Sequence, residues 1–257
     1  PAAVNATLYD KLNFNFVRDI APVAAIVRFP TVMTVNPSVP AKTVLEFITY
    51  AKANPGKISF ASGGVGTPDH VAGVLFKMMT GINMVHVPYR GASPALTDLI
   101  AGQVHVYFTA LPEAIEHIRA GRLRPLAVTT GTRLEVLPNV PTVGEFVPGY
   151  ETADWKSVLA PKNTSPEIID KLNSEFNAAL ADPEIKRRLA DIGFTPLAGK
   201  PADDDFYGIA FQASTACARA SGVISAPDSM RAISCSRSGP LTTLTVLRAV
   251  SAVRSLR

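Results

Sequence analysis

Three short segments of the sequence combine glycine or hydroxyl residues in a way that suits anion binding. They are residues 62–67, which hold three glycines within four positions, residues 89–93 and residues 109–111. Glycine lets backbone N–H groups approach a ligand closely, and a helix that begins after such a loop adds unpaired N–H groups and a positive dipole end. A carboxylate suits this arrangement. A tight strand-to-helix turn that binds nothing is an equally good explanation of the same spacing.

Four side chains in or beside these segments are candidates for ligand contact. Arg90 has the geometry to hold a carboxylate through two hydrogen bonds, although a lone arginine is more often a surface charge. Tyr89 beside it supplies a phenol that either binds or packs, and Thr109 opens the third segment. His70 follows the glycine loop and is the one histidine near the expected site, since His86 and His105 alternate with valine in expected strands.

Sequence patterns typical of enzymes are absent. There is no G-x-S-x-G elbow and no Walker A motif, and residues 64–66 lack the third glycine of a dinucleotide fingerprint. The histidines have no zinc-site spacing. We therefore expect no catalytic residue, no metal and no cofactor, and we keep an α/β enzyme acting on a small acid only as an alternative.

The positive charge belongs to the end of the chain. The sequence has a net charge of +4, but residues 1–206 contain 19 Lys and Arg against 20 Asp and Glu. Residues 207–257 contain six Arg and one acid, and both cysteines, Cys217 and Cys235. A basic face for nucleic acid is therefore not indicated, and neither is a disulfide framework in the body.

The candidate segments are spaced by a repeated strand–loop–helix unit. Expected strands at 58–61, 84–87 and 104–108 each lead through one of the three loops into a helix that ends at Gly81, Gly102 or Gly121. A strand at 124–129 follows. Strands that alternate with helices in this way predict a parallel sheet, so the loops should meet at one sheet edge. We further expect strands at 23–27, 31–35 and 157–159, a helix capped by Thr43, and a Thr164/Glu167 capping box before a helix near 166–180.

The sequence also resembles the Bug/TctC family, the extracytoplasmic receptors of tripartite tricarboxylate transporters. The resemblance covers roughly residues 4–206, and its motifs occur in the family's order: 32–40 (VMTVNPSVP), 61–70 (ASGGVGTPDH), 85–91 (VHVPYRG), 94–104 (PALTDLIAGQV), 137–142 (LPNVPT), Trp155 and 159–161 (LAP).

This resemblance implies an α/β fold of the type II periplasmic-binding-protein kind, with two lobes built on mostly parallel sheets. It implies a periplasmic, monomeric receptor that captures a small carboxylate or amino acid for membrane permease subunits, without nucleic acid. By the family pattern, the second-lobe contacts would be Ser62, Gly63, Gly66, Thr67 and Tyr89. Thr109-Ala110 stands where relatives often carry a polar or acidic residue, which argues against amine recognition there.

The expected domains are a partial first lobe (1–35 and 151–206), a ligand-gripping second lobe (36–150) and an aberrant or disordered tail (207–257). The first residues match a point well inside the family, so we expect an incomplete first lobe, no signal peptide in this chain and weak or absent ligand binding. The tail suggests a shifted reading frame near residues 203–207. A role in ligand sensing through a two-component system remains an alternative to transport.

Overall fold

A five-stranded sheet forms the body of the molecule in the computed structural model, which describes residues 13–15 and 18–197. Its strand order is β4-β3-β5-β2-β6. Strand β3 runs parallel to β4 and β5, whereas β2 is antiparallel to β5 and β6. Four of the five strands thus share one direction, as the α/β prediction requires. The strands span Thr31–Val35 (β2), Ile58–Ser62 (β3), Met84–Pro88 (β4), Val106–Ala110 (β5) and Arg124–Val128 (β6).

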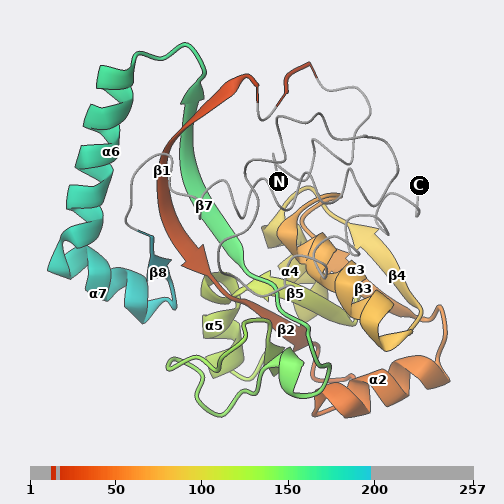
Figure 1. The fold of residues 1–257 in the computed structure, drawn as a ribbon. Coiled ribbons are helices and arrows are strands. Elements are labelled where there is room, and N and C mark those ends of the chain that lie inside the picture. Colours follow the sequence, from red (N-terminus) through yellow and green to blue (C-terminus); the bar gives the residue numbers. More distant parts are fainter. Residues whose placement is uncertain (1–12, 16–17, 198–257) are drawn as a thin grey trace.

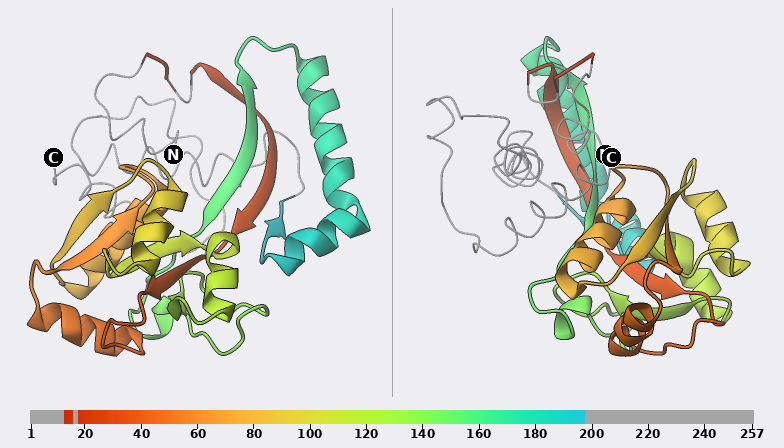
Figure 2. Two further views of the ribbon diagram at one scale, coloured as in Figure 1. Left: turned by 180° about the vertical axis from the view of Figure 1, so that it is seen from behind. Right: turned by 90° about the vertical axis from the view of Figure 1, so that its right-hand side faces the viewer.

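Helices cover both faces of this sheet because successive strand residues point to opposite sides. On β3, Phe60 packs into a core with α2 and α3, while Ala61 belongs to a second core on the other face with α4. Val32 of β2 joins a third cluster that includes α5. The result is a three-layer α/β body (Figure 2). The helices span Val44–Ala53 (α2), Pro68–Thr80 (α3), Ala92–Ile100 (α4) and Leu111–Arg119 (α5).

Two of the expected helix ends follow local rules, and one expected cap is replaced by its neighbour. Thr43 caps α2 by accepting the Glu46 N–H, and Gly81 ends α3 in the left-handed region at φ 70°. The predicted Thr164/Glu167 capping box is wrong. Ser165 caps α6 (Pro166–Ala181) instead, because the Thr164 hydroxyl donates to the carbonyl of Pro161. A capping box does form at Thr142 and Glu145, around the 3₁₀ helix η1 (Val143–Glu145).

A second, antiparallel sheet rises from this body (Figures 1 and 2). It has the order β7-β1-β8, with β1 at Ile20–Phe29, β7 at Asp154–Pro161 and β8 at Thr195–Pro196. Helix α6 packs along β1, where the Asn173 side chain donates to the carbonyl of Val23 at 2.8 Å. Helix α7 (Pro183–Asp191) follows and leads into β8.

Strand β1 continues into β2 with only Pro30 between them, so one stretch of chain serves both sheets. The expected lobe boundary at residue 35 placed residues 31–35 in the first lobe, but β2 pairs inside the five-stranded sheet. The pairing therefore changes sheet at Pro30. The expected tail at 207–257 lies outside the described residues, as does the end of the expected first lobe at 198–206.

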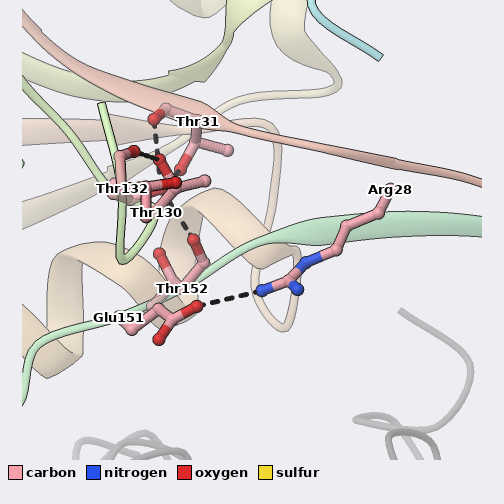
Figure 3. Close-up of polar contacts among 7 residues, drawn as sticks. Arg28, Thr31, Thr130, Thr132, Glu151 and Thr152 are labelled. Carbon is pink, nitrogen blue, oxygen red and sulfur yellow. Dashed lines mark hydrogen bonds and ion pairs between the residues drawn. The ribbon is translucent and has the colours of Figure 1, made fainter. Parts of the chain in front are cut away.

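Hydroxyl groups tie the two sheets together at this junction (Figure 3). The Thr129 hydroxyl lies 2.8 Å from the Thr31 hydroxyl and 2.8 Å from the carbonyl of Thr152. Beside them, the Arg28 guanidinium of β1 pairs with the Glu151 carboxylate at 3.0 Å, ahead of β7. Both chain connections between the sheets are thus bonded to each other.

Candidate functional site

The loops that follow β3 and β4 meet at one edge of the five-stranded sheet. The N–H of Tyr89 donates to the carbonyl of Ser62 at 2.9 Å, and the N–H of Gly91 donates to Gly63 at 3.1 Å. A Cβ at Gly63 would lie 3.3 Å from the carbonyl carbon of Gly91, so the close approach of the loops favours glycine there. Residues 109–111 do not form the expected third loop, because β5 extends to Ala110 and α5 begins at Leu111. Since β5 is parallel to β3, this direct β5–α5 junction still lies at the same edge.

The N–H groups of the glycine loop are mostly used within the protein, which corrects the expectation that they are free for a ligand. Each of four donates to an acceptor in the loop or in the first turn of α3. These are Gly63 to the Asp69 carboxylate, Gly64 to the Ser62 hydroxyl, Gly66 to Nδ1 of His70, and Thr67 to the carbonyl of Gly64. Gly63, Gly66 and Thr67 therefore shape the loop through these groups.

The first turn of α3 has donors left over. The Thr67 hydroxyl donates to the carbonyl of Gly64 at 2.6 Å instead of capping the helix. Within the described part of the chain, the N–H groups of Val65, Asp69 and His70 have no protein acceptor. A helix start with unpaired N–H groups attracts negative charge. The N–H groups that remain available to an anion are therefore those of Val65 in the loop and of Asp69 and His70 in the first turn of α3.

The side chains of Ser62 and His70 point into the protein. Ser62 is fully buried, and its hydroxyl lies 2.6 Å from Nε2 of His86. The His70 ring stacks on His86 with centroids 3.9 Å apart. Burial, His86 and Lys77 lower the pKa of His70 to about 3, and burial and Lys77 lower the pKa of His86 to about 4. Both rings are therefore neutral near pH 7, beneath the loop.

Tyr89 and Arg90 differ in how they are held. The Tyr89 hydroxyl donates to the Asp98 carboxylate of α4 at 2.7 Å, and partial burial together with Asp98 raises the pKa of Tyr89 to about 12. Arg90 is exposed, and it has no ion-pair partner among the described residues. The Arg90 guanidinium is thus available to an anion, whereas the Tyr89 hydroxyl is already hydrogen-bonded to Asp98.

Two carboxylates near the β5–α5 junction, those of Glu113 and Asp69, were not among the predicted site residues. The Thr109 hydroxyl, which is fully buried, donates to Glu113 at 3.3 Å. Burial raises the pKa of Glu113, and neighbouring Asp69 and Asp154 raise it further. Burial also raises the pKa of Tyr107, with added contributions from Asp69 and Glu113. A carboxylate in the first turn of each helix was the available signal for Asp69 and Glu113, and it was not used.

Other kinds of site are not indicated in the described residues. They contain no group of three His, Cys, Asp or Glu side chains placed to hold a metal ion. No described helix is both long and apolar enough to cross a membrane. A surface pocket lies between residues 131 and 151, lined by Gly131, Glu145, Tyr150 and Glu151 among others, and none of the three loops contributes to it.

Comparison with known families identifies a match over most of the chain. Residues 1–211 match the family model for the tripartite tricarboxylate transporter family receptor, TctC. A protein encoded between tcbD and tcbE in Pseudomonas sp. strain P51 is 36% identical over 77% of this chain and 60% of its own length. BugT of Bordetella pertussis is 34% identical over 78% of this chain and 62% of its own length. The chain thus spans about 60% of the length of these curated relatives.

Solved structures give the same result. Rpa4515 of R. palustris, solved with adipate, is 35% identical with a TM-score of 0.79, covering 87% of this chain and 74% of that one. The periplasmic binding protein BugD is 28% identical with a TM-score of 0.77, covering 86% of this chain and 76% of that one. The expected periplasmic-binding-protein fold is therefore confirmed.

Proposed function

This chain belongs to the TctC family, the tripartite tricarboxylate transporter family receptors, and from this membership we propose that it binds a small organic acid for transport. Receptors of this family bind solutes and are not enzymes. The likeness to a receptor solved with adipate supports a small carboxylate as the ligand class. The names of similar proteins, a periplasmic transporter and a periplasmic binding protein, support a periplasmic location and delivery to membrane permease subunits.

The ligand carboxylate is proposed to bind at the start of α3. The observation that carries this proposal is that Thr67 turns away from the helix end, which leaves the N–H groups of Asp69 and His70 without acceptors in the described structure. Arg90 supplies a cation from the neighbouring loop, and Gly91 holds that loop against Gly63. Ser62, Gly63, Gly66, His70 and Thr109 then act mainly by shaping the loops, and Tyr89 offers its ring.

An amino acid is a second candidate because of Glu113. Its carboxylate lies near those of Asp69 and Asp154 at the β5–α5 junction, where the Lys156 ammonium pairs with Asp154. The remaining negative charge of Glu113 and Asp69 suits an ammonium group. Thr109-Ala110 had argued against amine recognition at this position, but the acidic residue is supplied four positions later by α5. A dicarboxylate would be disfavoured by the same charge.

Calorimetric titration of the full chain with adipate and with glutamate separates the two ligands. With adipate as ligand, Glu113→Gln should tighten binding by about threefold to tenfold, since a nearby like charge is removed. With glutamate, the same change should weaken binding by a similar factor. Glu116→Gln, on the exposed side of the same helix beside Arg119, is the matched control. Because weak binding is expected of an incomplete first lobe, the titrations extend to millimolar ligand and include citrate, nicotinate and terephthalate. An equal effect of Glu113→Gln on adipate and on glutamate would contradict a role of Glu113 in choosing between them.

Arg90 gives an independent test of the site itself. Arg90→Gln should weaken binding of the preferred acid by about tenfold, and Arg90→Lys should recover only part of it because lysine cannot form the paired hydrogen bonds of a guanidinium. Arg122→Gln, also on the surface but after α5, is the control. Equal affinity of Arg90→Gln and the unmodified chain would remove Arg90 from the site.

A further inference from the structure

Two imidazole rings lie face to face beneath the glycine loop. His70 of α3 and His86 of β4 have centroids 3.9 Å apart and ring planes 16° apart. Phe60 of β3 lies directly across from His86 in the parallel register, and their rings stack at 4.8 Å. His70 is only 4% exposed. The three rings form a near-parallel cluster between the loop and the core.

Each imidazole holds one end of the loop. Nδ1 of His70 accepts the N–H of Gly66 at 3.1 Å, which requires a lone pair on that nitrogen and places the ring proton on Nε2. Nε2 of His86 lies 2.6 Å from the Ser62 hydroxyl, and this hydroxyl also bonds the carbonyl and the N–H of Gly64. The conformation of residues 62–66 therefore depends on both rings.

A second ring proton on His70 would break its contact with the loop, and one on His86 would place a positive charge near the Lys77 ammonium. On His70, the added proton would place two donors, Nδ1–H and the Gly66 N–H, against each other. The Lys77 ammonium of α3 faces the cluster, 5.9 Å from the Phe60 centroid, and donates to the carbonyl of Met84. The facing side chains of β3, Phe60 and Ser62, carry no charge, and the Asp69 carboxylate is bonded to Gly63. The lowered pKa values of both histidines agree with this environment.

We propose that His70 and His86 are positioning residues for the glycine loop, and that the loop keeps its ligand-ready shape only while both rings are neutral. The link to ligand capture rests on the proposed function. The effect on the loop itself does not, because both contacts lie within the protein.

Hydrogen exchange of the full chain, followed by mass spectrometry over a peptide that covers residues 62–70, tests the proposal without a ligand. His70→Leu removes the acceptor, and exchange of the loop at about pH 8 should rise about tenfold. His70→Asn keeps an acceptor at the δ position and should retain most of the protection.

A pH series tests the role of the ring protons. Lowering the pH from about 8 to about 4 should reduce protection of the loop in the unmodified chain, after correction for intrinsic exchange. The reduction should be smaller in the double variant His70→Asn, His86→Gln. The α6 peptide, residues 166–181, is the internal control and should not respond.

Two results would overturn the proposal. Loop exchange in His70→Leu equal to that of the unmodified chain would show that the ring does not position the loop. An unchanged acid response in the double variant would show that the histidines are not the proton-sensitive groups. If His70→Leu fails to fold, the pH profiles of the unmodified chain and of the double variant still decide whether the histidines are the proton-sensitive groups. If adipate and glutamate do not bind but exchange behaves as expected, the ligand assignment fails and the positioning role stands.

Discussion

The carboxylate of Asp69 accepts a hydrogen bond from the N–H of Gly63, six residues earlier in the chain. The protein thus places one of its own carboxylates on an amide of the loop that resembles an anion site. This contact closes the loop onto the first turn of α3 and leaves ligand binding to the amides beyond it.

Asp69 should therefore stabilise the loop while repelling an anionic ligand. Asp69→Asn keeps an oxygen acceptor for Gly63 and removes the charge, so we expect adipate binding to tighten by about threefold or more, with little change in stability. Asp69→Ala also removes the acceptor and should lower the free energy of unfolding by about 1–2 kcal/mol. Calorimetry and urea denaturation measure the two effects. Weaker adipate binding by Asp69→Asn would contradict the repulsion.

Gly73 allows α3 to lie close against β3. A Cβ at this position would lie 2.5 Å from Cε2 of Phe60, and Phe60 is held by its stack with His86. Gly73→Ala gains about 1 kcal/mol of helix propensity, but overpacking costs about 1–3 kcal/mol, so we expect a net loss of stability. Thermal unfolding checks this. Adding Phe60→Leu makes room, and Gly73→Ala should then cost less; an equal cost in both backgrounds would rule out the clash.

Stability should fall as the solution becomes mildly acidic. His70 and His86 have pKa values of about 3 and about 4 in the folded chain, against 6.5 when exposed. The pKa of each ring is therefore lower in the folded chain than in the unfolded chain. Below pH 6.5 the unfolded chain binds protons that the folded chain does not, so the free energy of unfolding is highest above pH 6.5 and falls as the pH is lowered.

Urea denaturation between about pH 7 and about pH 5 measures the histidine contribution, since most carboxylates titrate at lower pH. Burial also lowers the pKa values of His105 and His117, which are retained in the variant, so the comparison of the two chains assigns the effect of His70 and His86. The double variant His70→Asn, His86→Gln should show a flatter slope of unfolding free energy against pH. If the unfolding free energy has the same slope against pH in both chains, groups other than His70 and His86 cause the loss of stability in acid.

The Tyr89 hydroxyl is expected to serve the fold more than the ligand. Tyr89→Phe removes the hydrogen bond to Asp98 and should cost about 0.5–1.5 kcal/mol of stability, with adipate affinity changed by less than about twofold. Tyr50→Phe on α2 is the control, as its hydroxyl has no hydrogen-bond partner among the described residues. A tenfold loss of affinity in Tyr89→Phe would place the hydroxyl on the ligand.

Local chemistry made the α/β units predictable. Thr43, Gly81 and the Pro at the start of α3 act on neighbouring residues, so their effects can be read from the sequence. Register is not local: nothing near residues 31–35 shows that β2 pairs between β5 and β6, and nothing in β1 shows that it pairs with β7, which lies at least 125 residues later (Phe29 with Asp154).

The meeting of two of the predicted loops could be foreseen from the sequence, but the contacts of their individual residues could not. The loops at the ends of β3 and β4 do come together, as parallel strands require. The expectation of free amides failed because Asp69 and His70 fold back onto Gly63 and Gly66, a choice set by side-chain rotamers and packing. The same residue types with the side chains turned outward would have left those amides open.

Pro30 makes residues 20–35 intolerant of insertion or deletion. Because β1 and β2 adjoin it directly, adding one residue there would shift one strand by a single position relative to its partners. A one-residue slip sends every side chain to the opposite face. In β1, Val27 would exchange its buried place with the exposed Arg28, and in β2, which is buried on both faces, Val32 and Met33 would exchange cores. Length variation in this chain should therefore concentrate in surface connections such as residues 131–141, and spare the passage between the sheets.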